Sequence, residues 1–374
     1  MKIKAAVLHE MGRRRPYAET KPLTITELEL HPPGPREVLV RIRAAGLCHS
    51  DLSVINGSRP RPTPMALGHE AAGEVVEVGT DVTRFEPGDH VVMVFVPSCG
   101  HCLACMEGRP ALCEPGAVAN GAGTLVSGEH RLHLNDAPVY HHMGVSAFAD
   151  HAVCSEHSLI KIERSLPFEE AALFGCAVLT GVGAAVNTAK VAPGTTVAVI
   201  GLGGVGLNAM LGARLAGARE VIAVDIHDSK LELARQLGAD ATFNAGDANC
   251  AEHLREATCG GVDYALEMAG SVQALDLAYR ITRRGGTTVT AGLPHPDHRL
   301  ELQAVNLVAE ERTLKGSYIG SCVPLRDVPR YIDLYRKGKL PVDRLMSDRI
   351  GFEDLNAAFD RLADGHTVRQ ILVP

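Results

Sequence analysis

The chain has 374 residues, of which 46% are hydrophobic and 22% charged, and its formal net charge is −7. This length exceeds what one ordinary hydrophobic core organises, so two domains are expected. The acidic balance argues against nucleic acid or an anionic membrane surface as a partner.

The cysteines and the apolar stretches bear on the cellular compartment. The ten cysteines include C-x2-C spacings, and residues 1–10 lack the apolar run of an export signal. Reduced thiols in the cytoplasm are therefore expected. Residues 171–189 and 191–213 are uncharged and long enough to cross a bilayer. Because they are rich in Gly, Ala, Thr and Asn and flank a turn-like segment at 190–194, we expect buried elements of a globular protein, not a membrane anchor.

The first half of the chain is rich in predicted strands. Residues 38–43, 73–79 and 90–96 show strand-like alternation, with a turn at 87–89. A short helical segment is expected to begin at Cys48. Residues 116–144 have weak periodicity, and we expect them to form a loop over the domain.

Four cysteines are crowded together as Cys99-x2-Cys102-x2-Cys105-x7-Cys113. Four thiolates fill the tetrahedral coordination of zinc and leave no open position, so this set predicts a structural metal site. The alternative, four free thiols on a loop, is disfavoured because clustered exposed thiolates are reactive.

A second set of metal-ligand residues, Cys48, His69 and Cys176, is spread along the sequence. A Cys/His/Cys set leaves the fourth zinc position for water or substrate, as catalytic zinc requires. A single Cys or His is more often a packed core residue, so the spacing alone is weak support. The flanking residues His49, Ser50, Asp51 and Glu70 strengthen it.

The pattern changes near Pro193 to alternating strands and helices. Helices are expected at residues 229–237 and 272–281, and later at 328–337 and 352–363. Six strand-like runs are predicted at residues 196–200, 220–224, 241–243, 262–266, 287–291 and 313–317. This alternation predicts a parallel, doubly wound sheet with right-handed crossovers. The run at 369–373 is expected to return as a strand to the first domain.

A glycine motif, Gly201-x-Gly203-x-x-Gly206, joins the first of these strands to a helix. In a dinucleotide site the three glycines allow a tight turn, close approach of the pyrophosphate and close packing of helix on strand. Asp225 ends the next strand, where a carboxylate accepts hydrogen bonds from ribose hydroxyls and repels a 2′-phosphate, so NAD is favoured over NADP. A merely glycine-rich turn is the alternative, which this context disfavours.

Taken together, these motifs resemble the zinc-dependent, medium-chain alcohol dehydrogenase family over essentially the whole chain. The resemblance rests on Gly46-Leu47-Cys48-His49-Ser50-Asp51, Gly68-His69-Glu70, the Cys99–Cys113 segment, Phe174-Gly175-Cys176 with Leu179-Thr180-Gly181, and Gly201–Gly206. It implies an α/β fold: a GroES-like barrel catalytic domain at residues 1–178, completed by 321–374, and an NAD-binding Rossmann domain at 179–320.

The resemblance also implies roles for individual residues. Cys48, His69 and Cys176 would bind catalytic zinc, Glu70 would lie behind it as a transient ligand, and Asp51 would orient His69. With the structural site, this makes two zinc ions per subunit. Ser50 would hydrogen-bond the substrate oxygen. The expected coenzyme contacts are His49, Thr180, Gly201, Gly203, Gly204, Val205, Gly206, Asp225, Lys230, Ala291, Leu293 and Arg369, and the expected substrate pocket is Phe95, His142, Met143 and Leu293.

Two positions depart from the family pattern. Ser53 stands where many members carry a histidine that ends a proton relay, so the relay must end elsewhere. Ala117 stands where the glutathione-dependent formaldehyde dehydrogenase branch has an arginine, which argues against that substrate, although the length of the 116–144 segment resembles that branch.

The sequence therefore predicts NAD-dependent oxidation of primary or secondary alcohols, with apolar or aromatic substituents, to aldehydes or ketones, and the reverse reaction. The alternatives are the glutathione-dependent formaldehyde reaction and a non-catalytic relative, which the intact ligand set disfavours. Polyol oxidation is disfavoured by Cys176. The resemblance implies a homodimer or homotetramer through the segment at 300–317. Cys154, Cys250, Cys259 and Cys322 are expected to be buried thiols without an assigned role.

Overall fold

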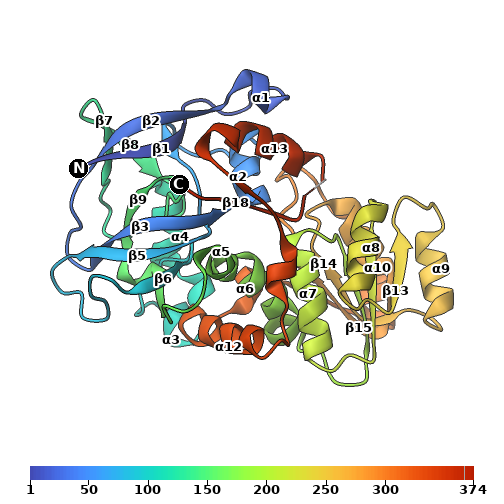
Figure 1. The fold of residues 1–374 in the computed structure, drawn as a ribbon. Helices are drawn as coiled ribbons and strands as arrows, with labels where there is room; N and C mark the ends of the chain where they lie inside the picture. Colours follow the sequence, from blue (N-terminus) through green and yellow to red (C-terminus); the bar gives the residue numbers. More distant parts are fainter. Residues whose placement is uncertain (366) are drawn as a thin grey trace. The chain divides into compact units, whose positions relative to one another are not determined.

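A computed structural model describes residues 1–365 and 367–374 of the chain (Figure 1). The chain divides into two compact units. Unit 1 contains Met1–Cys176, Val323–Ile332 and Val342–Pro374, and unit 2 contains Ala177–Cys322 and Asp333–Pro341. Each unit is described by itself below.

Unit 1 contains a closed barrel of five strands. In barrel order these strands are β1 (Lys2–Leu8), β2 (Leu23–Leu30), β7 (Leu132–Leu134), β8 (Ala137–His141) and β4 (Met65–Ala66). Alternate positions of β1 and β2, including Ala5, Val7 and Leu28, point into one buried apolar cluster. Closing the sheet leaves no free edge at which the barrel could pair with another chain.

A second, seven-stranded sheet of unit 1 carries the candidate site. Its order is β10 (Leu159–Ile162), β6 (His90–Met93), β5 (Ala71–Val78), β3 (Glu37–Gly46), β18 (Arg369–Leu372) and β17 (Met346–Ile350), and β9 (His151–Ser155) also pairs with β3. β18, drawn red in Figure 1, lies antiparallel to the end of β3. The prediction that residues 369–373 return to the first domain as a strand is therefore confirmed.

The prediction of a loop at residues 116–144 was wrong. The structure places helix α4 (Glu114–Ala122) and the hairpin β7–β8 there. The helix was missed because it is short and contains Pro115, Gly116 and Gly121, residues with low helix propensity. The strands were missed because they have only three and five residues, too few to show an alternation.

Unit 2 is built on a six-stranded parallel sheet. Its order is β13 (Ala241–Asn244), β12 (Glu220–Asp225), β11 (Thr196–Ile200), β14 (Val262–Glu267), β15 (Thr282–Thr290) and β16 (Thr313–Gly316). All five pairings are parallel, as the strand–helix alternation predicted. Both neighbours along a strand, such as Val197 and Ala198, are buried, because helices cover both faces of the sheet.

The helices of the two units are mostly short. Those of unit 1 are α1 (Tyr17–Thr20), α2 (His49–Ile55), α3 (Leu103–Met106), α4, α5 (Phe168–Ala172) and α13 (Leu355–Ala363). Those of unit 2 are α6 (Ala177–Gly183), α7 (Gly204–Leu215), α8 (Asp228–Gln236), α9 (Cys250–Ala257), α10 (Val272–Ile281) and α11 (Ala304–Ala309); α12 (Pro324–Arg336) has residues in both units. α9 and α10 cover the sheet face that carries Ala198 and Ile200.

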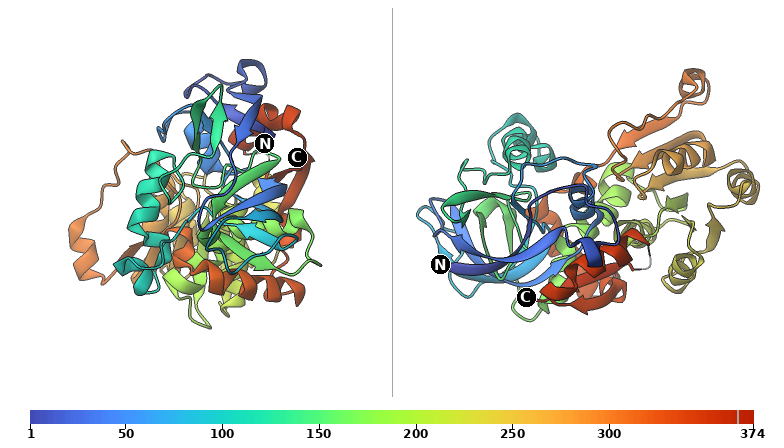
Figure 2. Two further views of the ribbon diagram at one scale, coloured as in Figure 1. Left: turned by 90° about the vertical axis from the view of Figure 1, so that its left-hand side faces the viewer. Right: turned by 90° about the horizontal axis from the view of Figure 1, so that it is seen from above.

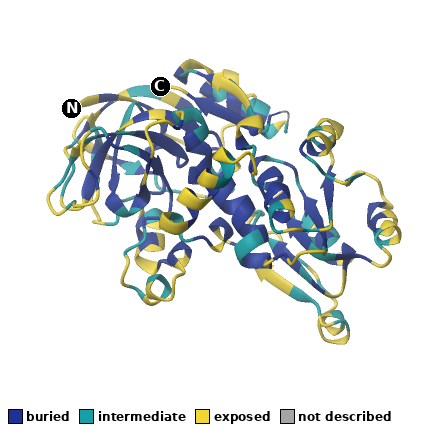
Figure 3. Cartoon of the chain, turned by 60° about the horizontal axis from the view of Figure 1, so that its bottom comes forward, coloured by how far each residue is buried: buried dark blue, intermediate teal, exposed yellow. Residues whose placement is uncertain are grey.

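Burial differs along unit 2. The central strands are buried, shown dark blue in Figure 3, whereas the segment around α11 is exposed. This segment, orange in Figure 2, stands out from the rest of unit 2. Its apolar side chains Val305 and Val308 are 66% and 81% exposed.

Two further expectations concern the apolar stretches and the unassigned cysteines. Among the described residues no single helix could span a membrane; a bent pair, Phe168–Gly175 with Ala177–Ala189, meets only the length and composition criteria. Cys154, Cys250 and Cys322 are buried as predicted. Cys259 is exposed, contrary to the prediction, because it lies after the end of α9 in a turn with φ of 52°.

Candidate active site

Cys48 is positioned by the junction of β3 with α2. It is the N-cap residue of α2, in extended conformation, and its side chain accepts a hydrogen bond from the backbone of Asp51. In return, Asp51 Oδ2 accepts from the backbone N–H of Cys48 at 3.3 Å. This reciprocal arrangement is a capping box, so a local helix signal fixes both side chains.

His69 is positioned by a turn between β4 and β5. The preceding Gly68 has φ of +93°, and a Cβ there would collide with the backbone of Phe148. Glycine is therefore required to bring His69 into place. His69 Nδ1 lies 3.1 Å from Asp51 Oδ1. Because an ionised carboxylate can only accept, Nδ1 carries the proton and Nε2 keeps its lone pair.

Cys176 completes this cluster from the start of α6. It follows the short 3-10 helix η3 (Leu173–Gly175) and lies two residues after Phe174. The ligand atoms of Cys48, His69, Glu70 and Cys176 all lie within 4.8 Å of one another, and all four residues are buried. The structure thus brings together residues separated by more than a hundred positions in the sequence.

The charges around this cluster are unusual for a buried site. The contact with the Cys176 thiol, and then the charge of Arg369 and the contact with the His69 ring, hold the pKa of Cys48 well below its ordinary value against the effect of burial. Burial would raise the pKa of Asp51, but the adjacent His69 and His142 rings lower it. Burial raises the pKa of Glu70 to about 7.

Arg369 supplies the compensating positive charge. It begins β18 and is only 4% exposed. Its Nη1 donates to the carbonyl oxygen of Leu47 at 2.8 Å and lies 3.3 Å from Glu70 Oε2. The structure therefore places Arg369 against Glu70; its contact with the coenzyme pyrophosphate, which the resemblance implied, stays a prediction.

The four crowded cysteines form a second cluster. The sulfurs of Cys99, Cys102, Cys105 and Cys113 lie within 4.8 Å of one another. Backbone N–H groups of Cys99 and Gly116 donate to the Cys113 sulfur at 3.2 and 3.4 Å, and that of Cys102 donates to the Cys99 sulfur at 3.3 Å. Such donors stabilise sulfur that carries negative charge.

Both clusters fit zinc by their donor chemistry. Tetrahedral zinc–thiolate bonds of about 2.3 Å place the sulfurs roughly 3.8 Å apart, within the observed limit. In the buried cluster, His69 Nε2 and both oxygens of Glu70 have no hydrogen-bond partner among the described residues. Orphaned buried donors and acceptors are costly, and a metal ion would satisfy the imidazole lone pair.

The glycine motif in unit 2 has the form that pyrophosphate requires. Gly201 has φ of +89°, and a Cβ on it would contact Ala269 at 2.7 Å. A Cβ on Gly206 would collide with the carbonyl oxygen of Gly201, so the helix approaches the strand closely. In contrast, a Cβ on Gly203 would meet only open space. Gly203 is the N-cap of α7, where backbone N–H groups bind anions.

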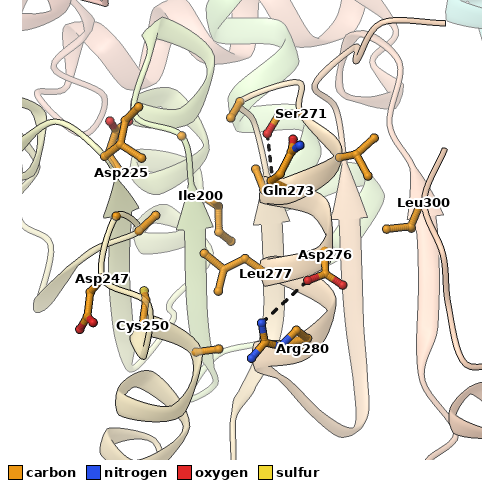
Figure 4. A pocket seen from close by; sticks show the side chains of 18 of the residues that line it. Ile200, Asp225, Asp247, Cys250, Ser271, Gln273, Asp276, Leu277, Arg280 and Leu300 are labelled. Atoms are coloured by element: carbon orange, nitrogen blue, oxygen red, sulfur yellow. Dashed lines mark hydrogen bonds and ion pairs between the residues drawn. The ribbon is translucent and has the colours of Figure 1, made fainter. Parts of the chain in front are cut away.

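Asp225 ends β12 beside this loop. It is buried, Oδ2 accepts from the backbone N–H of Leu202 at 2.6 Å, and Oδ1 accepts from that of His227 at 2.9 Å. These bonds tie the carboxylate to the glycine loop. A cavity of about 670 Å³ opens next to it, lined by Ile226, Ala245 and Gln273 among others (Figure 4).

Glu267 fixes the far side of the glycine loop. It is 1% exposed, and its oxygens accept from the Gly270 N–H at 2.6 Å and the Thr290 hydroxyl at 2.7 Å. Burial raises the pKa of this carboxyl group. These bonds hold the turn at residues 267–270, which contains Ala269. Ala269 lies directly beside Gly201, so Glu267 helps to shape this end of the cavity.

The other predicted site residues lie as follows. In unit 1, His49 is exposed and Ser50 half-buried in the first turn of α2, while Phe95, His142 and Met143 are buried. In unit 2, Thr180 is buried on α6, Gly204 and Val205 begin α7, Lys230 is half-buried on α8, Ala291 follows β15, and Leu293 is 51% exposed.

Several contacts of the predicted site residues, and a few further residues, were not predicted from the sequence. The contact of His142 with Asp51, the pairing of Arg369 with Glu70 and the anchoring by Glu267 depend on tertiary structure. For two residues that line the cavity, the sequence contained a weak indication. Ile226 directly follows Asp225, and Gln273 lies close to the start of α10 at Ser271.

Comparison with known proteins agrees with this site. Residues 34–164 match the family profile described as alcohol dehydrogenase GroES-like domain, and residues 204–337 match that of zinc-binding dehydrogenase. The chain is 40% identical over all of both chains to putative alcohol dehydrogenase D of Mycobacterium tuberculosis, and 38% identical to alcohol dehydrogenase class-3 of Myxine glutinosa, covering 94% of each.

Solved structures show the same fold. Benzyl alcohol dehydrogenase from Acinetobacter calcoaceticus matches with a TM-score of 0.92 and 33% identity, covering 100% of this chain and 99% of that one. A putative zinc-binding dehydrogenase from Sinorhizobium meliloti, bound to NADP, matches with a TM-score of 0.81 and 27% identity over both whole chains.

The chain belongs to the zinc-dependent medium-chain alcohol dehydrogenase family. The resemblance stated from the sequence motifs and the predicted combination of a GroES-like barrel with a Rossmann-type parallel sheet are confirmed. Members of this family act on small-molecule alcohols with zinc and a nicotinamide coenzyme.

Proposed function

We propose that this protein oxidises primary and secondary alcohols that carry apolar or aromatic substituents, and reduces the matching aldehydes and ketones, with NAD as coenzyme. The observation that carries the proposal is the buried convergence of Cys48, His69 and Cys176, with Glu70 beside them. Two sulfurs and one imidazole leave a tetrahedral position for substrate.

The residues around this site are proposed to have different roles in the reaction. When bound, zinc supplies a Lewis acid that lowers the pKa of an alcohol hydroxyl, and the coenzyme accepts the hydride. Ser50, half-buried in the first turn of α2, would take the hydroxyl proton and pass it to the coenzyme ribose. Ser53 Oγ already donates to the carbonyl of His49 at 2.8 Å, so the proton is proposed to leave through water.

The substrate preference is proposed from the apolar side chains of unit 1. Phe95 and Met143 are 6% and 8% exposed, and the Phe95 ring packs edge-to-face on the His69 ring at 5.3 Å. An apolar or aromatic substituent can replace water against such side chains, whereas a polar one would leave its hydrogen bonds unmade.

The Cys99–Cys113 cluster is proposed to bind a structural zinc, which gives two zinc ions per chain. Its four sulfurs would fill the coordination sphere and leave no place for substrate. The backbone donors to Cys99 and Cys113 support thiolate ligands there.

NAD is proposed in preference to NADP because of Asp225. Its buried carboxylate lies beside the cavity in unit 2, where it can accept from ribose hydroxyls and would repel a 2′-phosphate. Gly203, Gly204 and Val205 are proposed to bind the pyrophosphate through the N-terminus of α7, and Lys230, Thr180 and Ala291 to contact the ribose and nicotinamide.

A homodimer or homotetramer is proposed through the edge of the unit 2 sheet. β16 is an edge strand with mostly exposed residues, and α11 next to it exposes Val305 and Val308. Exposed edges and apolar patches of this kind are usually covered by another chain. A cytoplasmic location is proposed because all ten cysteines are free.

The test is a panel of alcohols followed by nicotinamide absorbance with each coenzyme. We expect benzylic and medium-length aliphatic alcohols to react with NAD, and Asp225→Ser to improve use of NADP by about tenfold or more, the effect of removing one repulsive charge. Activity with formaldehyde only when glutathione is added would instead favour the glutathione-dependent reaction, against which the absence of a guanidinium at Ala117 argues.

A further inference from the structure

His142, which the resemblance places in the substrate pocket, is a fully buried polar side chain to which the proposed reaction assigns no chemical step. It follows β8 and has no exposed surface. Neither of its ring nitrogens makes a hydrogen bond of good geometry with a described residue. Burying an imidazole costs free energy that a phenylalanine or leucine would not, so simple filling of space does not account for it.

The other ring nitrogen of His142 points to an explanation. His142 Nδ1 lies 3.2 Å from Asp51 Oδ1, and His69 Nδ1 lies 3.1 Å from the same oxygen. Two imidazoles thus share one carboxylate oxygen. His69 Nδ1 makes a hydrogen bond to this oxygen, whereas His142 Nδ1 makes a close polar contact without hydrogen-bond geometry. Because ionised Asp51 can only accept, either contact is favourable only when the nitrogen carries a proton.

Asp51 is itself a buried charge that depends on its donors. It has no exposed surface, and it also accepts from the backbone N–H groups of Cys48 and Gly68 at 3.3 and 3.2 Å. A carboxylate in such a place is stable only when its oxygens are satisfied. His142 Nδ1 adds a close polar contact to the oxygen that holds the metal-ligand ring.

His142 also packs directly against that ring. The His142 and His69 rings meet edge-to-face, with centroids 5.5 Å apart and planes at 89°. The backbone of His142 is fixed in turn, because its N–H donates to Ser146 Oγ at 2.9 Å and its carbonyl accepts from Val145 and Ser146. His142 is therefore held in place both through its backbone and through its ring.

We propose that His142 is a positioning residue for His69, acting through Asp51, so that it slows the release of zinc from the Cys48/His69/Cys176 site. The inference rests on the proposed catalytic zinc site. Partners that orient a ligating imidazole raise metal affinity, and their loss typically costs 10- to 100-fold.

Zinc release to a chromogenic chelator tests this on the intact protein. We expect His142→Phe, which keeps a ring but removes the donor, to release the zinc of this site about tenfold faster. His142→Asn, whose amide nitrogen replaces Nδ1, is expected to stay within about threefold of the wild type. The zinc of the Cys99–Cys113 cluster is an internal control whose release should not change.

A matched control is the neighbouring His141. It is also buried, but its Nε2 accepts from the backbone N–H of Arg131 at 3.1 Å, in the barrel. His141→Gln should leave zinc release unchanged. If His142→Phe does not fold, His142→Gln replaces it, because glutamine places its amide near the Nε2 position and leaves Asp51 without the donor.

The outcomes separate the inference from the proposed function. Wild-type release from His142→Phe, or equally fast release from His142→Asn, would overturn the role of the donor. A raised KM for alcohol with unchanged zinc release would overturn it too, and would place His142 in the substrate pocket. A wild-type protein that holds only one zinc ion per chain would instead contradict the proposed catalytic site.

Discussion

The two cysteine clusters of unit 1 are built from similar ligands in opposite ways. The Cys99–Cys113 cluster comes from fifteen consecutive residues, is partly exposed, and takes its hydrogen bonds from its own backbone. The cluster of Cys48, His69 and Cys176 comes from three separate parts of the chain, is fully buried, and is surrounded by the charges of Asp51, Glu70 and Arg369.

This difference shows how the surroundings of similar ligands can give one cluster a structural role and the other a catalytic role. Four local sulfurs would satisfy a metal completely, so the role proposed for that cluster is to hold its loop together. The dispersed cluster leaves a position open and surrounds it with charged groups whose pKa values are displaced, which is typical of functional sites.

The sharpest test of this contrast removes a ligand from the dispersed cluster. Cys48→Ala or His69→Ala should lower turnover by about a thousandfold or more, since a Lewis acid contributes several kcal/mol to the transition state. Zinc should fall from two ions per chain to one, with NAD binding retained. Cys154→Ala, at a buried thiol outside both clusters, is the control. Survival of most of the activity in either variant would refute the assignment of the site.

Removing a ligand from the local cluster should have a different, smaller effect. Cys105→Ser should also cost one zinc ion, but the folded protein should keep turnover within about threefold. The midpoint of thermal unfolding should fall by roughly 5–10 °C, because the binding free energy of a structural metal contributes to folding. A loss of turnover as large as that of Cys48→Ala, without a change in the midpoint, would contradict the division of roles.

The smallest effect concerns acid, which releases zinc either by protonating ligands or by unfolding unit 1. Burial lowers the pKa of His141 to about 3. The unfolded chain, with a pKa of about 6.5, therefore binds a proton that the folded chain does not, and the free energy of unfolding falls as pH decreases from about 6.5 toward 3.

At pH 5 this contribution amounts to about 2 kcal/mol. His141→Gln should flatten the decline between pH 7 and 5 by up to about 1.4 kcal/mol per pH unit, measured by denaturant titration. Equal slopes for the variant and the wild type would show that His141 does not contribute. If acid releases zinc from both clusters at the same pH, and His141→Gln shifts this release to lower pH, we would assign the release to unfolding of unit 1.

The contrast between the clusters also explains what could be predicted from the sequence. The Cys99–Cys113 set, the glycine motif and the strands of unit 2 are local patterns, and the sequence was sufficient to predict the strands and the fold class. The hairpin β7–β8 was missed because its strands are too short to show a period.

The surroundings of the dispersed cluster could not be predicted in the same way. Nothing near His142 or Arg369 in the sequence indicates that one contacts Asp51 and the other Glu70. These contacts arise because β8, β18 and α2 meet in the folded unit, and only the family resemblance marked the residues beforehand. The resemblance identified Arg369 as a site residue, but it did not predict the contact of Arg369 with Glu70.

The pairing of β18 with β3 has a consequence for how the protein is made. β3 is synthesised early, but Arg369 and the rest of β18 leave the ribosome only after all of unit 2. The sheet that holds Cys48 thus lacks its partner strand, and Glu70 its counter-charge, until unit 2 has been synthesised. Unit 2, which is almost continuous in the chain, can fold meanwhile, so the charged site is assembled only after unit 2 has been synthesised.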